Sequence, residues 1–142
     1  DAPIIGNMVS YVPEVAQASD SRTEGLYTVA SFYMPPFKSA PEGSWTSEWY
    51  ARYLELFDEE PAAQSIIGYV IADLTVRALE AAGSDLTREK VLAALETIEN
   101  YEDPFGGPSL TFSPTKHQGG DYLYLYEVVD GKWVVVEERI PF

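Results

Sequence analysis

The chain has 142 residues, and its 9 lysines and arginines stand against 23 aspartates and glutamates, which gives a formal charge of −14. Such a negative field repels nucleic acid and anionic membrane surfaces, whose binding requires clustered basic side chains. The absence of cysteine excludes disulfides, thiolate catalysis and cysteine-based metal sites. Hydrophobic residues make up 46% of the sequence and aromatic residues 13%, which is enough apolar surface for the core of one domain of ordinary size.

Targeting signals are not visible in the chain. Its start has neither the basic nor the apolar region of a signal peptide, so either such a peptide has been removed or the start is not the natural one. The longest uncharged apolar stretch, residues 61–72, falls well short of the roughly 20 residues that a membrane-spanning helix needs, and we expect no membrane insertion. The acidic excess would equally suit a protein from a high-salt organism, where it would reflect solubility rather than a ligand.

The first part of the chain predicts two strands with a short helix between them. An apolar run closed by glycine, residues 3–6, indicates the end of a buried strand that leads into a loop at residues 7–11. Proline is favoured at the first position of a helix, which predicts helical turns over residues 13–18, ended by the polar residues 19–21. Residues 26–32 are rich in β-branched and aromatic side chains and predict the second strand.

The middle of the chain predicts three helices. The first spans residues 44–57, with Thr46 or Ser47 as its N-cap. The second spans residues 62–82 and is apolar on nearly every side, so protein must cover most of its faces. Its one charged stripe consists of Asp73, Arg77 and Glu80. Gly83 ends this helix, and Thr87 is a natural N-cap for the third.

The last part of the chain predicts three strands, at residues 109–112, 122–128 and 133–137. The pair Asp130-Gly131 between the last two favours a tight hairpin turn. Tyr122, Tyr124 and Tyr126 share one strand face, and such a stripe is more often core or interface than a ligand box. Together the elements predict an α/β chain whose sheet is assembled from distant pieces.

Catalytic and cofactor motifs are largely missing from the sequence. There is no Gly-x-Ser-x-Gly elbow, and no glycine-rich loop with a lysine leads into a helix, so neither serine catalysis nor a nucleotide site is supported. His117, the single histidine, lies among turn residues. The acidic clusters at 58–60 and 102–103 lie at predicted helix ends and lack EF-hand spacing, so solvated loops are the default. We therefore expect no enzyme activity, no cofactor and no metal.

Two segments of the chain resemble a known family. They are residues 83–95, Gly-Ser-Asp-Leu-Thr-Arg-Glu-Lys-Val-Leu-Ala-Ala-Leu, and residues 107–119, Gly-Pro-Ser-Leu-Thr-Phe-Ser-Pro-Thr-Lys-His-Gln-Gly, followed by Gly131-Lys132-Trp133. In this order the chain resembles the C-terminal part of a type I periplasmic binding protein, nearest to the branched-chain amino acid (Leu/Ile/Val) substrate-binding proteins of ABC transporters. The resemblance spans essentially all 142 residues. It implies that the N-terminal half of a longer protein is absent here.

The resemblance implies a partial two-lobed, three-layer α/β fold. Residues 1–33 would belong to the C-terminal lobe, residues 37–100 would return as helices to the N-terminal lobe, and residues 109–142 would cross back as strands. Strands of the absent half would then cover the apolar helix at 62–82. On this mapping we expect the chain not to exist as an isolated compact monomer, and we expect its cover to be the N-terminal half, as a separate chain, or a second copy.

The resemblance also implies where a solute binds. The loop at residues 7–11 corresponds to a family loop that reaches the ligand, so Ser10 and Tyr11 are candidate contacts, and Tyr33 is another. The loop has no acidic residue before Glu14 to meet the ammonium of an α-amino acid. A plain surface loop is the alternative at this position.

The function implied by the resemblance is capture of a small organic solute, amino acid-like or a carboxylate or amide, by hinge closure for ABC-type import. The location would be periplasmic or otherwise extracytoplasmic, and the partner of the full-length protein would be an ABC permease. The alternative is a ligand-sensing regulatory domain on the same scaffold.

Overall fold

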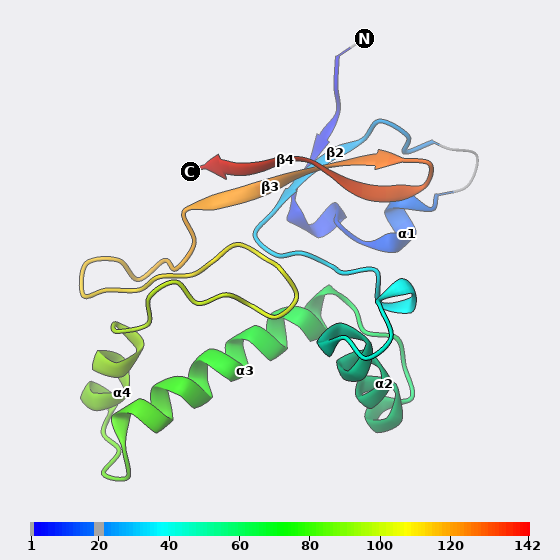
Figure 1. Ribbon diagram of the computed structural model, residues 1–142. Helices are drawn as coiled ribbons and strands as arrows, with labels where there is room; N and C mark the ends of the chain where they lie inside the picture. The colour runs from blue at the N-terminus through cyan, green and yellow to red at the C-terminus, as the bar shows by residue number, and fades with distance from the viewer. Residues whose placement is uncertain (1, 19–21) are drawn as a thin grey trace. The chain divides into compact units, whose positions relative to one another are not determined.

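The computed structural model describes residues 2–18 and 22–142, so residues 19–21, the predicted end of the first helix, lie outside the described part. The chain divides into two compact units (Figure 1). Unit 1 combines Asp1–Tyr33 with Asp121–Phe142, and unit 2 is Met34–Gly120. Residues 109–120, which the sequence groups with the last strands, therefore lie in the helical unit.

Unit 1 is built on a four-stranded sheet in the order β1-β2-β3-β4. Its strands are β1 (Ile5–Gly6), β2 (Tyr27–Ala30), β3 (Tyr122–Val129) and β4 (Lys132–Pro141). The first pair is parallel and the other two pairs are antiparallel. The sheet is thus assembled from the two ends of the chain, as the sequence predicts.

One face of this sheet is the core of unit 1. The 3-10 helix η1 (Met8–Ser10) and the short helix α1 (Pro13–Ala16) pack on it. The Tyr11 ring stacks on Tyr126 with the ring centroids 4.1 Å apart, and Trp133 Nε1 donates to the Val12 carbonyl over 2.9 Å. Tyr126 is fully buried, and its hydroxyl donates to the Phe32 carbonyl over 2.9 Å. The tyrosine stripe of β3 is therefore core at Tyr126, the more frequent role of such a stripe.

The hairpin between β3 and β4 confirms the predicted turn. Asp130 and Gly131 have φ values of 51° and 70°, so both central residues are left-handed, as a type I′ turn requires. Val129 and Lys132 pair directly on either side of them. Both strands extend beyond their predicted ends, because β3 continues to Val129 and β4 runs from Lys132 to Pro141, which pairs with Tyr122.

Unit 2 begins with the 3-10 helix η3 (Phe37–Ser39) and the helix α2 (Trp45–Phe57). The predicted caps Thr46 and Ser47 are wrong, because the Ser44 side chain is the cap and accepts from the Ser47 N–H over 3.2 Å. Thr46 and Ser47 lie inside the first turn. The Glu60 carboxylate accepts from the Tyr50 hydroxyl over 2.8 Å and pairs with Lys38 Nζ over 3.0 Å. The Lys38 contact and then the Tyr50 bond lower the pKa of Glu60.

The helices α3 (Ala63–Ala82) and α4 (Arg88–Leu95) follow the sequence prediction closely. Gly83 ends α3 with a φ of 79°, and the Thr87 side chain caps α4 by accepting from the Lys90 N–H over 3.2 Å. The predicted charged stripe contains an ion pair between Arg77 and Asp73 at 2.9 Å. Packing on α4 and the following loops buries only part of α3, and three large apolar side chains of the helix stay exposed: Ile71, Val76 and Leu79.

The predicted strand at 109–112 is wrong. These residues form only an isolated bridge between Leu110 and Tyr101. Prolines flank the segment on both sides, and its amides bond to loop carbonyls, such as Phe112 N to Ile98 O over 2.8 Å. The loop before it carries the buried Phe105 ring, which lies edge-on to Trp49 with centroids 4.9 Å apart. In the part of the chain that the structure describes, no helix combines the length and apolar character needed to cross a bilayer.

Candidate functional site

The candidate site lies at the carboxyl ends of β1 and β2. Because these two strands are parallel, the chain leaves both of them at the same edge of the sheet. Open α/β sheets bind ligands at this edge, where the loops that follow the strands converge. The loop after β1 contains Asn7 and η1, and the stretch after β2 contains Ser31 and Tyr33. The sequence-predicted residues Ser10 and Tyr33 therefore both belong to segments that leave this edge.

A hydrogen-bond network centred on Asn7 fixes the loop after β1. The Asn7 carbonyl accepts from the Ser10 hydroxyl over 2.6 Å, from the Ser10 N–H over 2.9 Å and from the Thr28 hydroxyl over 2.7 Å. The Asn7 side chain in turn accepts from the Val9 N–H over 3.1 Å and caps η1. Thr28 is fully buried in β2, so the loop is anchored to the interior of the sheet. The Ser10 hydroxyl thus holds the loop conformation.

Gly6 makes this close packing possible. A Cβ atom built on Gly6 would lie 2.3 Å from the Ser10 hydroxyl oxygen, much closer than non-bonded atoms approach. Glycine at the end of β1 therefore lets the loop fold back over the strand. The side chains of Met8 and Val9 are exposed at the tip of this loop.

Tyr11 and Tyr33 have different environments. The Tyr11 side chain is only 3% exposed, because its ring lies among Phe32, Tyr126 and Trp133. Burial, followed by the contact with Tyr11, raises the pKa of Tyr126. The Tyr126 phenol consequently stays protonated and can keep donating to its carbonyl partner. Tyr33 is half-buried at the end of unit 1.

Sequence reasoning did not single out Thr28, Asn7 or Ser31 at this edge. Thr28 lies inside a predicted strand, where the β-branched shape of threonine is enough to explain its presence. Its hydroxyl bond to Asn7 joins residues 21 positions apart. The one available signal for Asn7 was its position directly before a short helical turn, where asparagine is a frequent cap.

The segments that follow β1 and β2 carry no charged side chains at this edge of the sheet. The first acidic residue after β1 is Glu14, and residues 31–37 contain no acidic or basic side chain. Hydroxyls, an amide and apolar side chains are therefore what the loops offer to a solute. Such groups orient a ligand by hydrogen bonds and apolar contact.

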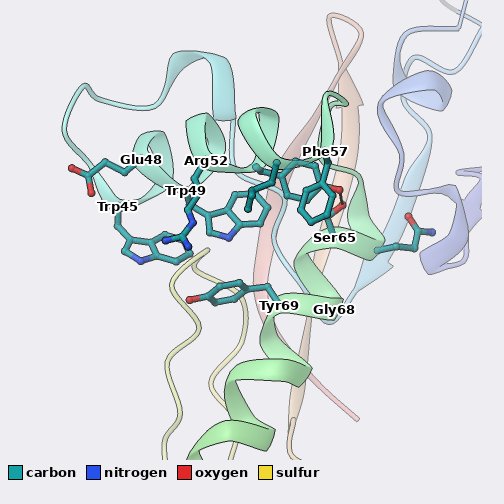
Figure 2. A pocket seen from close by; sticks show the side chains of 11 residues that line it. Trp45, Glu48, Trp49, Arg52, Phe57, Ser65, Gly68 and Tyr69 are labelled. Carbon is teal, nitrogen blue, oxygen red and sulfur yellow. Dashed lines mark hydrogen bonds between the residues drawn. The ribbon is translucent and has the colours of Figure 1, made fainter.

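Unit 2 contains a separate groove between α2 and α3, with a volume of about 650 Å³ (Figure 2). One wall is the aromatic stripe of α2, in which Trp49 and Tyr53 lie one helical turn apart with centroids separated by 5.1 Å. On the α3 side Gly68 leaves open space, and Ser65 forms a 2.8 Å hydrogen bond with the Tyr53 hydroxyl. Five of the eleven lining residues are aromatic, which suits apolar packing, and the polar side chains of Glu48, Arg52 and Gln64 also line the groove.

The described residues contain no group of three or more histidines, aspartates and glutamates placed to hold a metal ion. His117 Nε2 lies 3.4 Å from a Glu96 carboxylate oxygen, on a largely exposed side chain. The Asp103 carboxylate accepts from the Phe105 N–H over 2.7 Å and caps its own loop. Burial raises the pKa of Asp103 despite that bond.

Solved structures of the same fold come from bacterial solute-binding proteins. A branched chain amino acid ABC transporter structure from Thermus thermophilus with bound valine is 19% identical, and the match covers 97% of this chain and 39% of that one at a TM-score of 0.74. A substrate-binding periplasmic protein from Ralstonia solanacearum is 24% identical, with 96% and 38% coverage and a TM-score of 0.70. An ABC transporter solute binding protein from R. palustris in complex with benzoate is 21% identical, with 98% and 36% coverage and a TM-score of 0.66.

These likenesses establish the fold, and this chain spans well under half the length of each of those proteins. No curated protein sequence matches the chain significantly. The sequence model of the periplasmic binding proteins matches residues 3–132, which is nearly the whole chain. The chain therefore belongs to the periplasmic binding protein family.

Proposed function

We propose that this chain is the C-terminal portion of an extracytoplasmic solute-binding protein, which captures a small organic solute by hinge closure and delivers it to an ABC permease. The family match over residues 3–132 carries this proposal. On this proposal the chain performs no chemistry, and its task is to bind, enclose and release.

The solute contacts are proposed at the carboxyl edge of β1 and β2. Ser10 and Tyr33 belong to the segments that leave this edge, and the exposed Met8 and Val9 add apolar surface. Tyr11 supports the loop from below, because its ring is stacked on Tyr126 and is nearly inaccessible. The neutral loops favour a carboxylate, an amide or the apolar part of an amino acid-like solute over direct pairing with an ammonium group.

A complete site needs a second wall. In this proposal residues 1–33 belong to the C-terminal lobe, the helices of 37–100 belong to the N-terminal lobe, and the chain from 109 onward leads back to the C-terminal lobe, where β3 and β4 lie. The exposed apolar side chains of α3 and the aromatic groove beside α2 are then packing surfaces for the other half of the protein, supplied as preceding sequence, as a separate chain or by a second copy.

The experiment is a calorimetric titration of the full gene product with valine, isoleucine, benzoate and their amides. We expect at least one of these probes to bind with micromolar or better affinity. In that protein Ser10→Ala should weaken binding roughly fivefold, equivalent to about 1 kcal/mol for one lost hydrogen bond that holds the loop. Ser84→Ala, at an exposed serine between α3 and α4, is the matched control and should bind as the parent does. Equal affinities of the Ser10 and Ser84 variants would remove this loop from the site.

A further inference from the structure

Arg139 is the basic side chain of unit 1 at the edge of the sheet that carries the candidate site. The described part of unit 1 contains two others, Arg22 and Lys132. Arg22 precedes β2 and Lys132 begins β4 beside the hairpin turn, so both lie toward the amino end of β2. At the other end, Ala30, the last residue of β2, faces Tyr124 from one side and Arg139 faces it from the other. Figure 1 shows β3 beginning and β4 ending at this edge.

A β-bulge in β4 sets the backbone of Arg139. The register shifts there by one residue, so that Tyr124 on β3 faces both Glu138 and Arg139. Arg139 has a φ of 62°, in the left-handed region that residues other than glycine seldom adopt. Bulges beside binding sites re-aim a side chain, and strained backbone persists where function requires it. The backbone alone favours glycine at this position, so an arginine here points to a role of its side chain.

The guanidinium of Arg139 lies at the end of the tyrosine stripe of β3. It stands over the Tyr122 ring, 5.4 Å from the ring centroid. The centroids of Tyr122 and Tyr124 are 6.1 Å apart, and those of Tyr124 and Tyr126 are 6.2 Å apart. Tyr126 is fully buried, whereas Tyr122 and Tyr124 are half-buried. Burial raises the pKa of Tyr126 most, and neighbouring tyrosines add to the rise, among them Tyr33. The candidate contact Tyr33 therefore lies near the stripe.

The Arg139 guanidinium makes no salt bridge within the described residues, whereas that of Arg77 is paired with Asp73 over 2.9 Å. Its planar fork of N–H donors matches the two oxygens of a carboxylate. A carboxylate solute is repelled by a chain of net charge −14, so a site for it needs a local cation. Among the described basic residues of unit 1, Arg139 is the one that can supply this cation at the edge where β2 ends.

We propose that Arg139 is the carboxylate-binding residue of the solute site. The solute carboxylate accepts from the guanidinium, and the apolar body of the solute packs against the exposed parts of Tyr122, Tyr124 and Tyr33. Neighbouring strands lie about 4.8 Å apart, so β4 is about 10 Å from β2, a gap that an extended arginine side chain and a small solute together span. The proposal rests on the proposed function and names the class of solute, a small aromatic or aliphatic carboxylic acid.

The test is calorimetry on the full gene product with two pairs of probes, benzoate with benzamide and 3-methylbutanoate with its amide. The members of a pair have nearly the same shape and carry no ammonium group, so their difference reports on the carboxylate. Arg139→Asn removes the cation with a residue that tolerates left-handed backbone, and Arg139→Gly removes it and relieves the strain. Lys132→Gln, which removes the same charge from the other end of β4, is the matched control. Urea unfolding checks that each variant folds.

We expect the parent and the Lys132→Gln protein to bind each carboxylate at least about tenfold more tightly than its amide, as a charged hydrogen-bonded pair provides. Both Arg139 variants should lose this preference and keep the amide affinity of the parent. A merely structural role of Arg139 would instead weaken binding of the carboxylate and the amide alike.

Three outcomes would overturn the proposal: equal affinities of the parent for carboxylate and amide, a preference that survives in both Arg139 variants, and failure of both carboxylates to bind. In each of these cases binding of valine or isoleucine would still support the proposed function. Conversely, carboxylate binding that depends on Arg139, without the compaction in small-angle scattering that hinge closure requires, would count against the proposed function alone.

Discussion

Replacing Thr28 with valine tests whether the hydrogen-bond network at Asn7 holds the loop after β1. Valine keeps the branched shape in a fully buried position, so no cavity forms, but the 2.7 Å bond to the Asn7 carbonyl is lost. That carbonyl keeps its bonds from the Ser10 N–H and hydroxyl, so no buried acceptor is left without a donor. The expected loss is therefore near the net value of one hydrogen bond, about 1 kcal/mol of unfolding free energy and about 2–4 °C in Tm.

Thr28→Ser provides the matched control for this substitution. Serine keeps the hydroxyl and loses one methyl group, at a similar cost of about 0.8 kcal/mol. Urea unfolding should therefore not distinguish the two variants, whereas hydrogen exchange should. In Thr28→Val the amide of Ser10 should exchange about fivefold faster than in Thr28→Ser, because only the valine variant loosens the loop locally. Equal exchange rates of the Ser10 amide in the two variants would refute the claim that the hydrogen-bond network at Asn7 positions this loop.

Three further substitutions have opposite or pH-dependent effects. Gly6→Ala should destabilise unit 1, because its Cβ would lie 2.3 Å from the Ser10 hydroxyl, whereas Gly68→Ala in α3 meets no atom within 4 Å and should stabilise by about 0.5–1 kcal/mol; urea midpoints that move the same way for both would contradict this reasoning. Asp103→Asn should remove a pH dependence: burial raises the folded-state pKa of Asp103 above its ordinary 3.8, so ionisation costs stability above the folded pKa and that cost disappears as the pH falls below 3.8. The stability of the parent minus that of the variant, measured by urea unfolding from pH 7 to pH 3, should thus rise toward acid, and a flat difference would count against a buried carboxylate.

The local elements of this protein were determined by its sequence. The helices α2, α3 and α4, the Thr87 cap and the Asp130-Gly131 turn follow from side-chain periodicity, capping chemistry and the left-handed backbone that glycine tolerates. These are interactions between residues a few positions apart, so the sequence pattern contains them. The predicted strand at 109–112 failed because its pattern showed apolar alternation but not whether a neighbouring strand would be available.

Only the tertiary structure decided which residues share a surface. The bond between Thr28 and Asn7, the fit of Gly6 under Ser10 and the burial of Tyr11 against Tyr126 all depend on strand register across residues distant in sequence. The sequence shows an aromatic residue at Tyr11 and predicts a loop there, but it contains no information on which ring packs against the Tyr11 ring. The burial of Thr28 and Tyr126 on one face of the sheet has the same origin, because a face is defined by pairing between the two ends of the chain.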